Sequence, residues 1–450
     1  MPALPRGAAC RAGRGSREDR PHAPPGDPPA SQPAALARGA GGHGQLPQEH
    51  GVFLRALRYP VPDCRADPGR GRLGVAVPRG GARGPASGDQ EDVMAFAHRR
   101  MPFMVLGALS LLAALWAGLI RLGWALPPFA ATEPPNHGPL MVSGFLGTVI
   151  GLERAVALRR RWAYGAPLLA GLGGLAWVIG LSVHVGHALT AAGSAFLIAI
   201  FVTLYRQHPT VYLAAMGLGA VSWLGGTLVW HGGAPLHRVV PWWIGFLVLT
   251  IAGERLELSR LMRLGAWSRA GFLAAGGVFV LGLLADLSAP ELGVRLGGIG
   301  LLALAVWLLR NDIAWRTLRQ SGLPRYMALS MLSGYVWLGV GGLLWLGFAG
   351  RFIAGPFYDA MLHSIFLGFV FSMIFGHAPI ILPSVLGVAL PFRRAFYAHW
   401  ALLHLSVLAR VGGDLGLPML APAWSGLANV LAIVLFLVNS ARAVRLGPEA

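Results

Sequence analysis

The chain has 450 residues, of which 55% are hydrophobic and only 12% are charged, and its formal net charge is +18. Because ordinary soluble domains carry roughly 25% charged residues, this composition excludes a soluble globular protein and indicates an integral membrane protein whose main partner is the lipid bilayer. The basic residues lie before residue 94 and in short clusters between apolar runs. Without a basic amphipathic face, no nucleic-acid partner is expected.

Residues 1–93 form a low-complexity segment that is rich in Pro, Gly and Arg and has no helical or strand periodicity. Such a segment cannot bury a core, so we expect it to be disordered. It contains no apolar region of the kind that a secretory signal needs. A basic tail lying on anionic lipid is one alternative. The preferred interpretation is a mis-assigned start, with translation beginning at Met94 or Met101 and the transmembrane helical domain at 94–450.

From Met101 onward, apolar stretches recur that are each long enough to cross a hydrocarbon core of roughly 30 Å as a helix. They predict an all-α polytopic membrane protein with about 12 transmembrane helices. The expected spans are 103–125, 137–157, 164–184, 187–205, 210–230, 240–260, 268–287, 292–310, 326–347, 358–378, 395–413 and 423–443.

The arginines indicate how these spans are oriented. Basic clusters lie before the first expected span, after every even-numbered span and after the last one. Since short basic loops stay in the cytoplasm, we expect both termini to be cytoplasmic. The chain is rich in Arg, Ala, Gly and Pro, as a GC-rich gene would produce. The expected location is therefore the cytoplasmic (inner) membrane of a GC-rich bacterium.

Three expected spans contain a similar segment that begins Gly-Phe and ends in a polar pair. Spans two, six and ten carry it, so the chain reads as three four-helix repeats, although Gly-Phe pairs also arise by chance in membrane proteins. The segments are 144–154 (GFLGTVIGLER), 245–255 (GFLVLTIAGER) and 368–378 (GFVFSMIFGHA).

The first two segments end in the charged pairs Glu153-Arg154 and Glu254-Arg255. A charge at membrane depth costs on the order of 2.5–3.5 kcal/mol. We expect two cross-repeat ion pairs to offset this cost, Glu153 with Arg255 and Glu254 with Arg154. The alternative is that all four are interfacial charges in contact with water.

Both cysteines, Cys10 and Cys64, lie in the leading segment, so a metal in the membrane part must be held by His, Met or carboxylate. Imidazole ligates haem, copper, iron and zinc. His137 and His363 each precede the Gly-Phe of their segment by a few residues, which predicts one membrane level and a shared site.

Two more histidines could supply a metal site nearer the inner side. His377 and His399 could meet across the short loop between spans ten and eleven, so they are also metal candidates. The alternative for each histidine is an interfacial imidazole that is hydrogen-bonded to backbone or water. The outer side also carries His184, His187, His231 and His237.

The segment Asn136-His137-Gly-Pro-Leu-Met141-Val-Ser-Gly144-Phe145 resembles the His-x-His-Glu-Met-x-x-Gly-Phe segment of NnrS-like membrane proteins. Leu362-His363-Ser-Ile-Phe-Leu-Gly368 resembles their Leu-His-Ala-Leu-x-x-Gly. The resemblance implies about twelve spans, bound haem and copper, and a role in tolerating nitric oxide. It implies His137 and His363 as cofactor ligands, with Met141 as a matching residue. Pro139 and Leu140 replace the second His and the Glu of that pattern.

Three functions remain open at this point. The first is a membrane protein that binds haem and/or copper through histidines near the outer face, in redox or nitrogen-oxide stress chemistry. The second is a 12-helix secondary transporter, and the third is an assembly protein of a membrane complex. No hydrolase triad, phosphate loop or HExxH motif is found, so the sequence does not decide whether the protein is an enzyme. A redox partner or a homo-oligomer also remains open.

Overall fold

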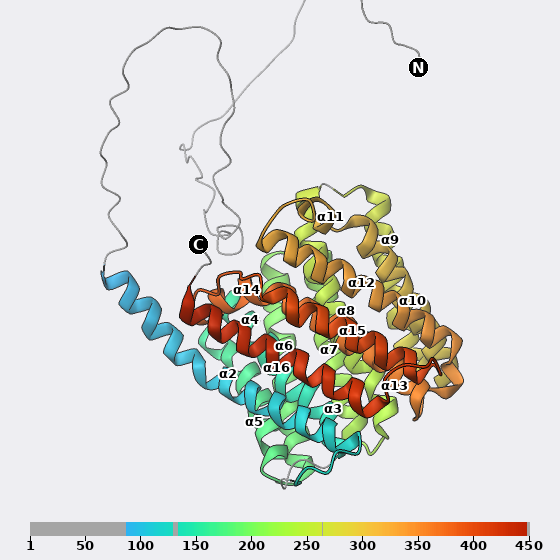
Figure 1. Ribbon diagram of the computed structural model, residues 1–450. Coiled ribbons are helices and arrows are strands. Elements are labelled where there is room, and N and C mark those ends of the chain that lie inside the picture. Colours follow the sequence, from blue (N-terminus) through green and yellow to red (C-terminus); the bar gives the residue numbers. More distant parts are fainter. Residues whose placement is uncertain (1–86, 129–133, 263, 448–450) are drawn as a thin grey trace, which may run out of the picture. The chain divides into compact units, whose positions relative to one another are not determined.

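The structure is a computed structural model that describes residues 87–128, 134–262 and 264–447. All regular secondary structure in these residues is helical, which confirms the all-α class (Figure 1). The predicted disorder of residues 1–86 lies outside the described residues. Helix α2 begins at Ser87, ahead of the boundary at 94 that the sequence suggested.

The helices follow one another through short connections. The α-helices are α2 (Ser87–Arg121), α3 (His137–Pro139), α4 (Gly147–Leu158), α5 (Gly165–Val178), α6 (Val183–Gln207), α7 (Val211–His231), α8 (Leu236–Leu258), α9 (Ala266–Asp286), α10 (Pro290–Asn311), α11 (Ala314–Thr317), α12 (Leu323–Gly347), α13 (Pro356–His363), α14 (Ser372–Leu386), α15 (Phe396–Asp414) and α16 (Pro422–Leu446). Short 3₁₀ turns are η1 (Pro134–Asn136), η3 (Arg161–Tyr164), η4 (Ser259–Met262) and η5 (Ala349–Arg351). Two π-helical segments, η2 (Leu140–Leu146) and η6 (Ser364–Phe371), join α3 to α4 and α13 to α14.

Ten helices in the described residues are long and apolar enough to cross a membrane, which suggests a membrane protein. Two of the twelve expected spans are not among them. Helix α5 has only 14 residues because its predicted span is interrupted at Ile179. Helix α15 carries Arg410 and Asp414 near its end, and these charges lower its mean hydropathy.

Large apolar side chains cover the outside of the bundle. Leu281 and Leu284 of α9 and Leu405 of α15 are each more than half exposed. Contiguous apolar surface of this kind is unfavourable in water and is expected where lipid chains are the solvent. The exposed side chains therefore agree with the membrane class that the composition indicates.

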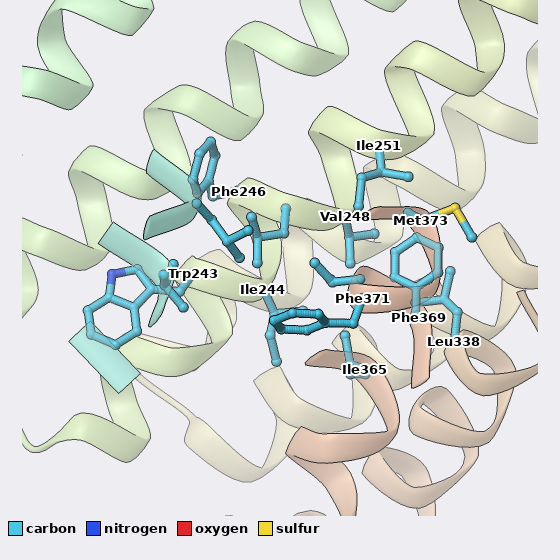
Figure 2. Packing of buried hydrophobic residues seen from close by; sticks show 14 of the residues in the cluster. Trp243, Ile244, Phe246, Val248, Ile251, Leu338, Ile365, Phe369, Phe371 and Met373 are labelled. Carbon is cyan, nitrogen blue, oxygen red and sulfur yellow. The ribbon is translucent and has the colours of Figure 1, made fainter. Parts of the chain in front are cut away.

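The three Gly-Phe segments lie in the most buried of these ten helices, α3–η2–α4, α8 and α13–η6–α14. Figure 2 shows Ile244 and Val248 of α8 packed close to Phe371 of η6. Phe371 also stacks on Phe145 of η2, with ring centroids 6.5 Å apart. The segments that look alike in the sequence therefore meet in the core.

Small residues allow neighbouring helices to touch backbone to backbone, which is how helices associate in lipid. In α9, a Cβ added to Gly282 would lie 2.4 Å from the backbone nitrogen of Gly297 in α10. By contrast, a Cβ on Gly276, also in α9, would meet no atom within 4 Å. Gly282 is thus required by packing, whereas Gly276 is not.

We predict that Gly282→Ala lowers the free energy of unfolding by about 1–3 kcal/mol, because backbone atoms of α10 must move to admit the methyl group. Gly276→Ala is the matched control in the same helix. It should leave stability unchanged or raise it by up to about 1 kcal/mol. Unfolding in mixed detergent micelles measures both variants. Equal stability of the two variants would contradict this packing.

Candidate functional site

His137 is held by a hydrogen bond to the neighbouring helix α2. Its Nδ1 lies 2.7 Å from the carbonyl oxygen of Ala114. A carbonyl oxygen can only accept, so Nδ1 carries the proton and donates it, and Nε2 retains the lone pair of the neutral ring. A Cβ on Gly118 of α2 would lie 2.9 Å from Nδ1, so α2 packs directly against this ring.

His363 has the same arrangement on another helix. Its Nδ1 lies 2.9 Å from the carbonyl oxygen of Asp359 and 3.2 Å from Oδ1 of the same residue. Both acceptors lie one helical turn earlier in α13. Nδ1 of His363 is therefore the donor as well, and Nε2 retains the lone pair.

His137 is the first residue of α3 and His363 is the last residue of α13, and the two lie close enough to act on each other electrostatically. A π-helical segment follows each of them, η2 after α3 and η6 after α13. Insertions of this type are frequent at functional sites. The charged and titratable groups that act on His137 are His363, Arg410 and Arg121. Met141 follows in the same span and is buried in the core.

An ion pair between the buried Arg410 and the partly exposed Asp359 fixes the carboxylate beside His363. Arg410 of α15 binds Asp359 through two hydrogen bonds, from Nε to Oδ2 at 2.6 Å and from Nη2 to Oδ1 at 3.0 Å. Nη1 of Arg410 also donates to Oδ1 of Asn429 in α16, at 3.4 Å. Asp359 is thereby oriented with one oxygen toward the imidazole of His363.

A second buried network lies around Arg255 of α8. Nε and Nη2 of Arg255 each donate to Asp312 at 2.8 Å, and the hydroxyl of Tyr335 donates to Oδ2 of the same carboxylate at 2.7 Å. Nη1 of Arg255 donates to Nε2 of His377 at 3.2 Å. Burial raises the pKa of the Asp312 carboxyl, but the ion pair and these hydrogen bonds outweigh burial and hold the pKa below its usual range.

One of the two expected cross-repeat ion pairs is present. Arg154 pairs with Glu254, as predicted, and also with its neighbour Glu153 at 2.8 Å. The expected pair of Glu153 with Arg255 is not formed. Arg255 binds Asp312 instead, because that carboxylate accepts two parallel hydrogen bonds from one guanidinium and is itself buried.

The histidines predicted to meet across the loop after α14 have separate partners. His377 uses Nδ1 for the carbonyl of Met373, at 2.7 Å, and Nε2 for Arg255. His399 uses Nε2 for the hydroxyl of Tyr326, at 2.9 Å, and Nδ1 for Asn439, at 3.2 Å. All four ring nitrogens are thus bonded to protein groups, and the structure does not join the two rings.

The comparisons with known proteins give a family. The model of a domain of unknown function, DUF8744, matches residues 100–445. The chain belongs to the DUF8744 family. No curated protein and no solved structure matches it. The matched residues lie within the domain that the sequence predicted at 94–450, and the NnrS-like resemblance of this DUF8744 chain stays a prediction.

Several site residues of the DUF8744 chain were not singled out in the sequence. Asp359 lies four residues before His363, a spacing that places two side chains on one helix face, and this was the available signal. Arg410 lies inside an apolar span, which was a second signal. Three outer histidines also meet at the ends of α6 and α7, His184, His187 and His231.

We predict that Asp312→Asn lowers the free energy of unfolding by roughly 3–5 kcal/mol at pH 7, because Arg255 keeps its buried charge without a counter-charge. Glu291→Gln, which opens the exposed pair with Arg295, is the control and should cost at most about 1 kcal/mol. Unfolding in detergent micelles measures both variants.

The pH dependence of this difference follows from the lowered pKa of Asp312. The carboxylate stabilises the fold fully above the ordinary Asp pKa of about 4, and the effect is lost only as pH falls through the lower pKa of the folded state. The gap between wild type and Asp312→Asn should therefore persist at pH 5 and shrink under more acidic conditions. A gap that widens on acidification would contradict the assignment.

Proposed function

We propose that this DUF8744 chain is a bacterial inner-membrane protein of NnrS-like type that binds haem or copper through His137 and His363. The observation that carries the proposal is that the two histidine rings make the same kind of hydrogen bond. Each donates Nδ1–H to the backbone, and each has Nε2 as its lone-pair nitrogen. Each ring lies shortly before a π-helical segment, and the two segments contact each other through Phe145 and Phe371.

The donor set fits a metal centre. A histidine that ligates a metal almost always donates its other ring N–H to a carbonyl or carboxylate, which fixes the ring and raises its basicity. His137 and His363 both have this arrangement. His377 and His399 do not, since side chains already occupy their second nitrogens. The geometry therefore favours His137 and His363 over the other two candidates.

Asp359 and Arg410 act as positioning residues in this proposal. Asp359 contacts Nδ1 of His363, and Arg410 holds Asp359 through two hydrogen bonds. Such a carboxylate–histidine pair keeps Nε2 aimed in one direction and supplies a nearby negative charge that favours a cation. The buried guanidinium prevents the carboxylate from rotating away.

The proposal includes the full topology that the sequence predicted. Helices α5 and α15 would complete twelve crossings in three four-helix units, each with one central helix. Hydrogen bonds from Arg100 to the carbonyl of Val385 and from Arg393 to that of Gly447 support it. These link the start of the apolar span in α2 (Arg99–Arg121) to the end of α14, and the loop after α14 to the end of α16, as an even number of crossings requires.

Bound haem or copper would supply one-electron chemistry and a coordination site for small nitrogen oxides. The protein would hold the group between two helices near the outer face. Its role would lie in redox or nitrogen-oxide stress responses, as the NnrS-like resemblance suggests.

A second candidate, a proton-coupled secondary transporter, is favoured by a different observation. The continuous helix α13–η6–α14 contacts two ionic networks, Asp359 with Arg410 near its start and, through His377, Arg255 with Asp312. Ionisable groups inside membrane bundles often mark ion pathways. A metal-free, colourless preparation that catalyses proton-linked uptake in liposomes would favour this candidate.

We predict that the purified full-length protein carries haem or copper, seen as a Soret band or as copper by elemental analysis. In the double variant His137→Ala, His363→Ala, the bound group should fall by on the order of tenfold or more. His237→Ala, an outer-side histidine away from the site, is the control and should retain it. Unchanged content in the double variant would overturn the assignment.

We also predict that Asp359→Asn weakens binding of the group by roughly 10–100-fold, because Nδ1 of His363 loses its charged acceptor. Asp312→Asn is the matched control, since it disturbs the other buried ion pair and leaves His363 untouched. Equilibrium competition with a chelator measures both. Equal losses in the two variants would mean that Asp359 acts only through stability.

A further inference from the structure

Three histidines converge where the first turn of α6 meets the last turn of α7. His184 and His187 lie three residues apart on one face of α6, and His231 is the last residue of α7. One ring nitrogen from each can be chosen so that all three lie within 4.8 Å of one another. The ring centroids are 5.5–6.1 Å apart.

The central imidazole of this group lacks a hydrogen-bond partner. His187 is only 4% exposed, and neither Nδ1 nor Nε2 has a partner among the described residues. Burying polar atoms without partners costs about 1–3 kcal/mol each. A ligand on one nitrogen would offset part of that cost. The other histidines of the described core, such as His377 and His399, do not share this feature.

Two tryptophans cover the buried ring of His187, while its two histidine neighbours are exposed. Trp230 lies against the ring with centroids 4.0 Å apart, and Trp177 lies edge-on at 6.1 Å. His184 and His231 are exposed. An ion could thus enter from the aqueous side, meet the two exposed imidazoles and reach the buried one.

The donor chemistry selects the class of ion. Three neutral imidazoles and no thiolate suit Zn²⁺ and its neighbours Co²⁺, Ni²⁺ and Cu²⁺, rather than Ca²⁺ or Mg²⁺, which prefer oxygen ligands. With metal–nitrogen bonds of about 2.0–2.1 Å, tetrahedral ligand atoms lie about 3.3 Å apart. Small side-chain rotations are therefore enough to bring the three ring nitrogens from within 4.8 Å of one another to this distance.

The structure assigns to His184, His187 and His231 a divalent transition-metal site of the Zn²⁺ class, at the end of the α6–α7 pair that the expected topology places outside. Water would complete the coordination. The site shares no residue with the His137 and His363 centre and does not depend on the proposed function. Bound metal would clamp the ends of two antiparallel helices that the short connection after Gln207 joins at the opposite end.

The test uses the full chain with His137→Ala and His363→Ala, so that the other centre contributes no metal. After chelator treatment, this protein is titrated with Co²⁺, whose visible absorption reports four-coordinate nitrogen ligation. We expect one Co²⁺ per chain, displaced by Zn²⁺. Adding His231→Ala or His187→Asn should weaken Co²⁺ binding by at least about tenfold, and His237→Ala should not.

Thermal unfolding checks that the variants fold. His231 is exposed, so His231→Ala should unfold at the same temperature as its parent without metal. Zn²⁺ should raise the melting temperature of the parent but not that of the His231→Ala variant, since only the folded parent binds it. No Co²⁺ binding by the parent, or equal binding by the parent and by His231→Ala, would overturn the site.

Discussion

A charge that lies away from water is tolerated when an opposite charge meets it with good hydrogen-bond geometry. Three ion pairs of this kind join helices in the described residues: Arg410 with Asp359, Arg255 with Asp312, and Arg154 with Glu254. Each joins segments far apart in the chain. They join α4 to α8, α8 to the residue that follows α10, and α13 to α15.

Two of these ion pairs contact a histidine ring, but at different ring nitrogens. Arg255 donates directly to Nε2 of His377, which uses the second nitrogen of that ring. Arg410 acts through Asp359, which contacts Nδ1 of His363 and leaves Nε2 as the lone-pair nitrogen. The two ion pairs thus contact their imidazoles at different nitrogens, Nε2 of His377 and Nδ1 of His363.

Local sequence patterns predicted the features that depend on one segment. The apolar stretches located the long helices, and the shared Gly-Phe segments turned out to lie in the three most buried of the ten candidate spans. The predicted pairing of Arg154 with Glu254 was correct because the two residues end equivalent segments. The π-helical turns η2 and η6 were not predicted, since they depend on how neighbouring helices pack rather than on local propensity.

Features that depend on which helices are neighbours could not be predicted from local sequence patterns. Asp312 lies just outside the expected span 292–310, and only the fold brings it to Arg255. His184 and His187 lie one turn apart, but their link to His231 requires α6 and α7 to be antiparallel neighbours, which the sequence suggests without fixing the ring positions. Arg410 carried a usable signal, because an arginine within an apolar span needs a buried partner.

The central claim is that Nε2 of His137 and Nε2 of His363 hold one metal centre. An experimental structure of the purified protein, with anomalous diffraction recorded at the iron and copper edges, tests this most directly. The account predicts an anomalous peak at about 2 Å from both Nε2 atoms. A map with no peak there, and with both Nε2 atoms in contact with protein or lipid, would contradict it.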